Sequence, residues 1–110
     1  MKLPNGDRAI VELEKLVDYC LSPDHPRGKH KARVFRSACG LMAEHAESVR
    51  QQLLEVAAQS EAVQTARTAH GRRYVVECML AGPSGRARVL TAWIVRDDED
   101  VPRFVSAYVM

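Results

Sequence analysis

The stretch RRYVVECMLAGPSGRARVLTAWIVR, residues 72–96, decides the fold class of this chain. Valine, tyrosine, isoleucine, threonine and tryptophan are frequent on both sides of its centre, and these residue types favour β-strands. The turn-forming residues Gly82-Pro83-Ser84-Gly85 interrupt the stretch. The pattern therefore predicts two antiparallel strands, Arg72–Leu80 and Arg86–Arg96, joined as a hairpin by the Gly82–Gly85 loop.

Further strands are predicted on both sides of this hairpin. Downstream, the acidic turn Asp97–Val101 leads into Arg103–Val109, and Pro102 stands at the entry to that strand, where proline is tolerated. Upstream, residues 61–71 have no clear period and are ambiguous, and Ala62–Thr65 are a candidate for a short edge strand. The prediction is an antiparallel meander of three to four strands.

The N-terminal half has helical periodicity instead. Apolar residues recur at spacings of three and four in residues 12–21, 29–39 and 44–60. Proline and glycine separate the first two segments, and Gly40 suits the C-terminal cap of the second. Three helices followed by a meander predict an α+β fold, in which the helices pack on one face of the sheet.

Length and composition limit the class of protein. The 110 residues allow a single domain, 1–110, with one core. The hydrophobic fraction of 46% and the charged fraction of 27% are ordinary for a folded protein. No segment approaches the roughly 20 apolar residues of a membrane span. We therefore expect a cytoplasmic protein.

The three cysteines are odd in number and form no CxxC pair. This pattern argues against a disulfide framework and against a zinc site. Cys20, Cys39 and Cys78 each have apolar neighbours, which predicts small buried thiols.

Alternation divides the strand residues into two faces. One set is apolar and is expected to lie under the helices: Val76, Cys78, Leu80, Leu90, Ala92, Ile94, Val105, Ala107 and Val109. The other mixes charges, hydroxyls and aromatic rings: Arg73, Val75, Glu77, Thr91, Trp93, Ser106 and Tyr108. The second face is expected to be free of helices. It is either a solvated surface with cross-strand pairs or a binding surface where Trp93 or Tyr108 stacks on a base.

The strongest local charge lies in residues 24–36, where five lysines and arginines stand against one aspartate, a balance of +4. Such a segment suits a phosphate backbone, although it is also typical of a solvated helix face. At about 100° per residue, Lys29, Arg33 and Arg36 share one side of the helix, whereas Lys31 falls in the apolar arc. Lys31 either extends past the core to water or reaches an anion site at the helix–sheet junction.

The four histidines lack metal-ligand spacing, and no acidic pair accompanies them. His30, beside Lys31, and His70, just before the sheet, are acid–base candidates because imidazole changes charge near neutral pH. There is no glycine-rich phosphate loop. Any catalysis is therefore expected to be acid–base chemistry without a metal or another cofactor.

The segment DYCLSPDHPRGKHKARVF, residues 18–35, resembles the opening of a family of small uncharacterised bacterial domains. The turn at Gly82, Pro83 and Gly85 and the segments TAWI, residues 91–94, and PRFVSAY, residues 102–108, extend the resemblance. It covers about Ala9 to Val109. The patterns HPxGxxKAxxF and PRxVxxY are specific as a pair.

Similar domains stand alone or form the C-terminal tip of bacterial polymorphic toxins, and their element order resembles the barnase–EndoU–colicin–RelE class of metal-independent ribonucleases. The resemblance implies an RNA site on a curved sheet face. The implied catalytic residues are Lys31, Arg103, Ser106, Tyr108 and His30. RNA contacts are expected from Trp93 and from the basic side chains of Arg27, Lys29 and Arg33. Relatives more often have threonine at Ser106 and leucine at Phe104; the hydroxyl survives the first change.

The expected function is a metal-independent endoribonuclease, the toxin of a bacterial toxin–antitoxin pair. Its partners would be RNA and a cognate antitoxin protein. The alternative is a non-catalytic module that binds nucleic acid or protein through the same basic surface.

Overall fold

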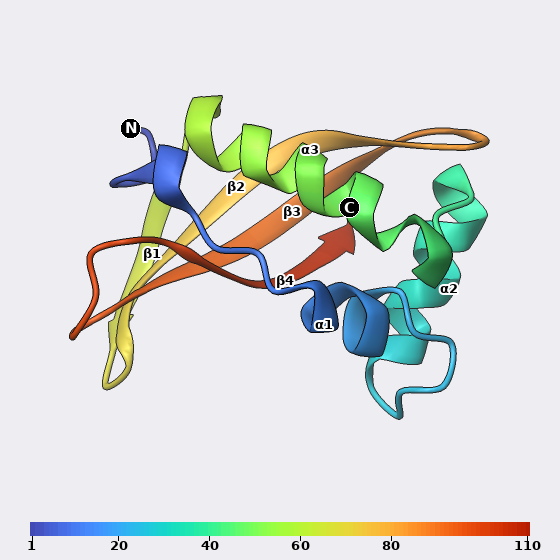
Figure 1. Cartoon of the computed structure of the whole chain (residues 1–110), viewed down its shortest axis with the longest axis horizontal. Coiled ribbons are helices and arrows are strands. Elements are labelled where there is room, and N and C mark those ends of the chain that lie inside the picture. Colours follow the sequence, from blue (N-terminus) through green and yellow to red (C-terminus); the bar gives the residue numbers. More distant parts are fainter.

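The computed structural model describes residues 1–110 and confirms the α+β class (Figure 1). The helical elements come first: the 3-10 turn η1 (Gly6–Arg8), α1 (Leu13–Lys15), the π-helical turn η2 (Leu16–Cys20), α2 (Gly28–Cys39), the 3-10 turn η3 (Ala43–His45) and α3 (Ala46–Gln59). The strands follow: β1 (Val63–Thr68), β2 (Gly71–Gly82), β3 (Gly85–Arg96) and β4 (Arg103–Val109). The first predicted helix is thus a short α-turn continued by a π-turn. None of the helices is long and apolar enough to cross a membrane.

The four strands form one antiparallel meander in the order β1-β2-β3-β4. Gly82 pairs with Gly85, so only Pro83 and Ser84 form the turn between β2 and β3. The candidate edge strand upstream is present as β1, which extends to Thr68 and pairs with β2 alone.

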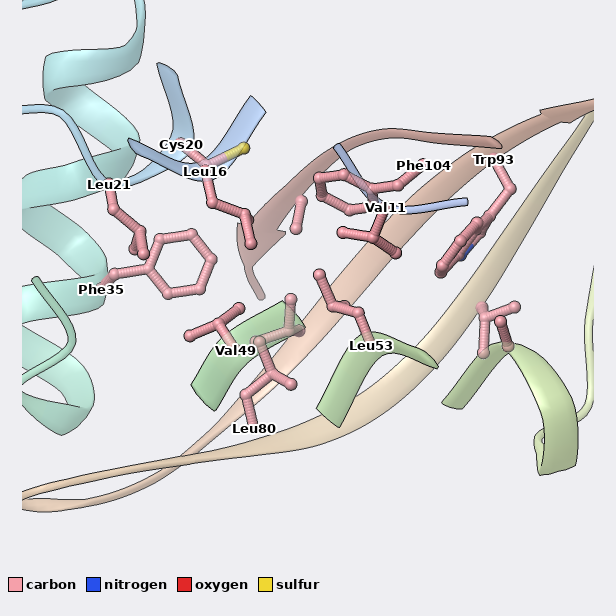
Figure 2. Close-up of a cluster of buried hydrophobic side chains, with 14 of the residues drawn as sticks. Val11, Leu16, Cys20, Leu21, Phe35, Val49, Leu53, Leu80, Trp93 and Phe104 are labelled. Carbon is pink, nitrogen blue, oxygen red and sulfur yellow. The ribbon is translucent and has the colours of Figure 1, made fainter. Parts of the chain in front are cut away.

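The core lies between α3 and the sheet. α3 runs across β2 and β3 (Figure 1), and its Val49 and Leu53 point toward the strands (Figure 2). They pack in one buried cluster with Leu80 and Trp93. Burying a side chain of this size contributes about 1.5–3 kcal/mol. The apolar stripe of α3 therefore holds it on one face of the sheet.

The segment from α1 to α2 covers the edge of the sheet at β4, and both helices and η2 contact that strand. α2 lies close against η2, because Gly28 at its start has no side chain. A Cβ at Gly28 would collide with the carbonyl oxygen of Tyr19. This close approach determines the geometry of the site described below.

The prediction of the two sheet faces is correct for β2 and wrong for β3. Val76 and Leu80 are buried as expected, but the residues of β3 buried beneath the helices are Ala87, Val89, Thr91, Trp93 and Val95. The register explains the error. Val76 pairs with Thr91 and Tyr74 pairs with Trp93, and directly opposite residues share a face. Leu90 and Ala92 consequently lie on the open face.

Thr91 and Trp93 are therefore core residues with satisfied polar groups. The Trp93 Nε1–H donates to Thr91 Oγ1 over 2.8 Å, and the Thr91 hydroxyl donates to the Val76 carbonyl oxygen over 2.8 Å. The Trp93 ring packs edge-on against Phe104, with centroids 5.5 Å apart. Trp93 is 0% exposed and presents no ring face to a base. The prediction that Trp93 stacks on RNA is therefore wrong.

Candidate functional site

Lys31 connects the first turn of α2 to the sheet. Its Nζ donates a hydrogen bond to Ser106 Oγ on β4, over 2.6 Å. The side chain is half-buried, while its neighbours Lys29 and Arg33 are exposed. Of the two positions considered for Lys31, water beyond the core or the helix–sheet junction, the structure shows the junction, where the ammonium group contacts Ser106.

A β-bulge on β4 places the Ser106 hydroxyl. Phe104 pairs with Trp93 and Ser106 pairs with Ala92, which leaves Val105 as an extra residue between them. Strict alternation would put residues 104 and 106 on the same face. The bulge instead leaves Phe104 in the core and directs Ser106 to the opposite side, as bulges beside functional sites commonly do.

Tyr19, the fourth residue of η2, packs between two polar groups. The Lys31 Nζ lies 5.0 Å from the centroid of its ring, and the His25 ring meets it edge-on with centroids 4.8 Å apart. The first contact is a cation–π interaction between the Lys31 ammonium group and the face of the ring. The aromatic ring thus brings Lys31 and His25 to the same place.

His25 caps the N-terminus of α2. Its Nδ1 accepts hydrogen bonds from the backbone N–H groups of Arg27 and Gly28, over 3.0 and 2.9 Å. The first N–H groups of a helix have no partner within the helix, so this cap satisfies two of them. Because Nδ1 uses its lone pair here, the proton of the neutral ring is on Nε2. His25 therefore offers its remaining nitrogen as a hydrogen-bond donor.

These side chains line an open cleft of about 650 Å³ between η2, α2 and β4. Its lining is Glu14, Lys15, Asp18, Tyr19, His25, Arg27, Lys31, Val105 and Ser106. Three cations against two carboxylates give the lining a net charge of +1. None of these five charged groups forms a salt bridge. The charges of the cleft are thus free to meet a ligand.

Cys20 lies behind Ser106, with its Sγ 3.9 Å from Ser106 Oγ. Burial raises the pKa of the Cys20 thiol, and the hydrogen bonds of Ala107 and Ser106 and the charge of Lys31 oppose this only in part. The thiol is therefore protonated at neutral pH and acts as a packing group. Cys39 is buried as predicted, and Cys78 is partly buried.

Arg103 lies outside the cleft and is held by two carboxylates. Its Nε and Nη2 each donate to Glu99 over 2.8 Å, and its Nη1 donates to Glu12 over 3.3 Å. The guanidinium group holds the pKa of Glu99 below its ordinary range, chiefly by hydrogen bonding. Arg103 thus joins the acidic turn after β3 to the start of β4.

The other predicted site residues are spread over the molecule. Tyr108 is 47% exposed and lies two residues beyond Ser106 on β4, outside the cleft lining. His30 is exposed on α2 and also lies outside it. Of the basic residues assigned to RNA, only Arg27 lines the cleft, whereas Lys29 and Arg33 line a separate groove.

Sequence reasoning missed His25, Tyr19 and the two carboxylates of the cleft as functional groups. The one signal for His25 was its place just before the second helix, where a side chain can accept hydrogen bonds from the backbone N–H groups two and three residues ahead. Tyr19 carried no comparable signal, because its position depends on the contact between η2 and α2.

Residues 2–110 match the profile of a protein family described as a domain of unknown function, DUF6883. The chain belongs to this family. The match spans every residue of the cleft, so the site lies within the family's domain. This confirms the expected membership of an uncharacterised domain family. A search among curated proteins found no match to the chain.

Proposed function

We propose that this domain is a metal-independent endoribonuclease whose active site is the cleft between η2, α2 and β4. The observation that carries the proposal is the contact of Lys31 with Ser106, in a cleft that also holds Arg27 and His25. These residues place two cations, an imidazole N–H and a hydroxyl in one cleft. Charged and neutral hydrogen-bond donors of this kind bind the oxygens of a phosphodiester. Residues 18–35 and 102–108 resemble a family of small uncharacterised bacterial domains whose element order resembles that of metal-independent ribonucleases, and this resemblance adds support.

The cleavage would begin with attack of the RNA 2′-hydroxyl oxygen on the adjacent phosphorus. The new bond joins the 2′-oxygen to phosphorus, and the bond from phosphorus to the 5′-oxygen breaks. The products are a 2′,3′-cyclic phosphate and a free 5′-hydroxyl, whose oxygen takes a proton from solvent. The proton of the 2′-hydroxyl passes to Glu14 or Asp18, the two carboxylates of the cleft, and then to solvent.

The remaining groups would stabilise charge. Negative charge grows on the phosphoryl oxygens as the reaction proceeds, and Lys31 and Arg27 supply positive charge to them. His25 donates its Nε2–H to the same oxygens while its Nδ1 stays bound to the helix cap. Ser106 holds the Lys31 ammonium in position. The proposed set of catalytic residues thus differs from the set predicted from the sequence, which included His30, Arg103 and Tyr108.

Cleavage of a fluorescent RNA oligonucleotide in excess EDTA tests this proposal. We expect fragments that end in a 2′,3′-cyclic phosphate, and no cleavage when the RNA is replaced by the 2′-deoxy analogue. Ser106→Ala should weaken cleavage more than Ser106→Thr, which keeps the hydroxyl. RNA that is bound but never cleaved would favour the non-catalytic binding module, and the absence of both would refute the proposal.

The contact between Lys31 and Ser106 also supports a second function. An amine within hydrogen-bond reach of a serine hydroxyl is the arrangement of Ser–Lys hydrolases, in which the amine takes the proton of the nucleophile. That chemistry needs a neutral lysine, whereas the RNA cleavage proposed above uses the Lys31 ammonium group as a positive charge. A fluorophosphonate probe decides between the two, since covalent labelling of Ser106 would indicate acyl transfer.

The cellular role follows from the proposed activity. An unrestrained endoribonuclease stops growth, so we propose the toxin of a toxin–antitoxin pair that acts in the cytoplasm and has a cognate antitoxin. Expression in a bacterium should arrest growth, and Lys31→Met should relieve the arrest. Arrest that persists with Lys31→Met at equal protein levels would separate toxicity from the cleft.

A further inference from the structure

A second concavity lies on α2, between its exposed side and the segment that leads into α3. Its volume is about 360 Å³. The apolar residues in its lining are Leu21, Pro23, Ala32, Leu41, Met42 and Ala43. Met42 is 38% exposed, so the groove presents an unbranched, adaptable side chain to its surroundings. This groove, termed the α2 groove below, plays no part in the proposed cleavage.

Three cations border the α2 groove. Lys29, Arg33 and Arg36 line it, and all three are exposed. None of them forms a salt bridge. Glu44 is the one acidic residue of the lining, which leaves a net charge of +2. The combination is an apolar floor beside a row of unpaired positive charges.

The α2 groove and the cleft lie on opposite sides of the same helix. At about 100° per residue, Arg27 and Lys31 project roughly 160° to 200° away from Lys29. Arg33 and Arg36 lie within about 40° of Lys29 on the other side. The basic segment of the sequence therefore serves two separate surfaces, and a ligand of one leaves the other open.

We propose that the α2 groove docks an acidic segment of a partner protein. One or two large apolar side chains of that segment would fill the floor, and flanking carboxylates would pair with Arg33, Arg36 and Lys29. Arginine is suited to this task because its planar guanidinium group binds a carboxylate through two parallel hydrogen bonds. Burial of the apolar anchor would supply affinity, and the cations would supply orientation and speed of association.

The lining favours a protein segment over RNA. The α2 groove contains no aromatic ring, so it lacks the stacking platform that binds unpaired bases. Its volume is near the lower end of the range of about 300–1,000 Å³ that is typical of ligand pockets, which suits a few side chains. A flat membrane surface would use the cations but would leave a concave floor unfilled.

Selection from a displayed library of random 12-residue peptides tests the proposal with the intact domain as bait. Enriched peptides should combine aspartate or glutamate with leucine, phenylalanine or tryptophan. Reversal of charge in the double variant Arg33→Glu, Arg36→Glu should weaken their binding at least tenfold. A peptide with lysine in place of its acidic residues should regain binding to that variant. Lys31→Met, on the cleft side, should bind the selected peptides as well as the wild type does.

Three results would overturn the proposal: no enrichment, enrichment of peptides without acidic residues, or equal binding to the charge-reversed variant. Phosphatidylglycerol vesicles and a fluorescent RNA serve as competing probes. If one of them binds in a way that depends on Arg33 and Arg36, and no peptide binds, the α2 groove is assigned to that ligand instead. Met42→Glu is a second variant that blocks the floor and leaves the three cations intact. Because the altered side chains are exposed, thermal unfolding should change little and so exclude misfolding as the cause.

Discussion

The Lys31 ammonium group on α2 lies 2.6 Å from the Ser106 hydroxyl on β4, and the two residues are 75 positions apart in the chain. The contact joins one feature of the helix to one feature of the strand. α2 supplies a lysine within its apolar arc, and the bulge at Val105 turns the serine away from the core to meet it. The cleft exists because the helical half and the sheet half of the fold join at this point.

Lys31→Met should abolish most of the cleavage activity. The substitution keeps the long apolar stem and removes the charge, so the rate should fall at least tenfold if the ammonium stabilises the transition state by about 1.4 kcal/mol or more. The variant loses the hydrogen bond to Ser106, which lowers stability, but it also removes a cation that the helix dipole disfavours in the first turn. The two effects oppose each other, so the free energy of unfolding should change by no more than about 1 kcal/mol. RNA cleavage and thermal unfolding measure the two effects.

The matched control for this substitution is Lys29→Met, two residues earlier on the opposite side of α2. It removes the same charge from the α2 groove and should leave cleavage close to the wild-type rate. Equal activity in both variants would show that the charge of Lys31 takes no part in cleavage and would remove the central residue of the proposed site.

His25 contributes to stability and to activity through different nitrogen atoms, so two substitutions should separate them. His25→Ala removes the helix cap and should cost about 1 kcal/mol of folding free energy. His25→Asn restores a side chain that caps helices well and should return most of that stability. Neither variant has the Nε2–H, so both should cleave RNA more slowly. Full activity of His25→Asn would limit His25 to capping.

The strands and helices were predictable because their signals are local. Alternation over residues 72–96 and Arg103–Val109 and helical spacing over residues 44–60 gave elements that the structure contains with small shifts at their ends. The direction of Lys31 was also predictable, because a helix fixes the angle between residues of known spacing. These inferences needed no knowledge of distant contacts.

The face of β3 was mispredicted because it depends on the turn. A two-residue turn at Pro83 and Ser84 makes Gly82 pair with Gly85 and places Val76 opposite Thr91. With all of residues 82–85 assigned to the loop, the pairing register between β2 and β3 was not defined. A slip of one residue in that register moves every side chain of a strand to the other face. The bulge at Val105 and the packing of Tyr19 also arise from tertiary contacts, so the full set of cleft residues required the structure.

Trp93→Ala tests the corrected face of β3. Removing a fully buried tryptophan that packs against Phe104 should destabilise the domain by about 3–5 kcal/mol. Chemical denaturation measures the loss. RNA binding should leave the fluorescence of Trp93 in the wild-type protein unchanged, because the ring is shielded from solvent and from ligands. Quenching of that fluorescence by RNA, with wild-type stability in the alanine variant, would restore the predicted stacking role.

The pairing of Arg103 with Glu99 should make stability depend on pH in the acid range. Because the pKa of Glu99 is lower in the folded state than in the unfolded chain, its contribution is fully present above the ordinary glutamate range. That contribution is lost as the pH falls through the lowered value. Unfolding midpoints of the wild type and Glu99→Gln should therefore differ at pH 7 and converge toward pH 3. A difference that stays constant over this range would contradict the ion pair.

Cys78 should resist alkylation in the native protein. Burial raises the pKa of its thiol to about 11, with a smaller effect from the charge of Glu77. The reactive species is the thiolate, so at pH 8 only about one molecule in a thousand carries it. Iodoacetamide should modify Cys78 far more slowly in the folded protein than in denaturant, where an ordinary cysteine pKa returns. Mass spectrometry of timed samples gives both rates, and Cys78→Ser serves as the control. Rapid native modification at Cys78 would show that the strand opens locally or that the thiol is less buried than its position on β2 indicates.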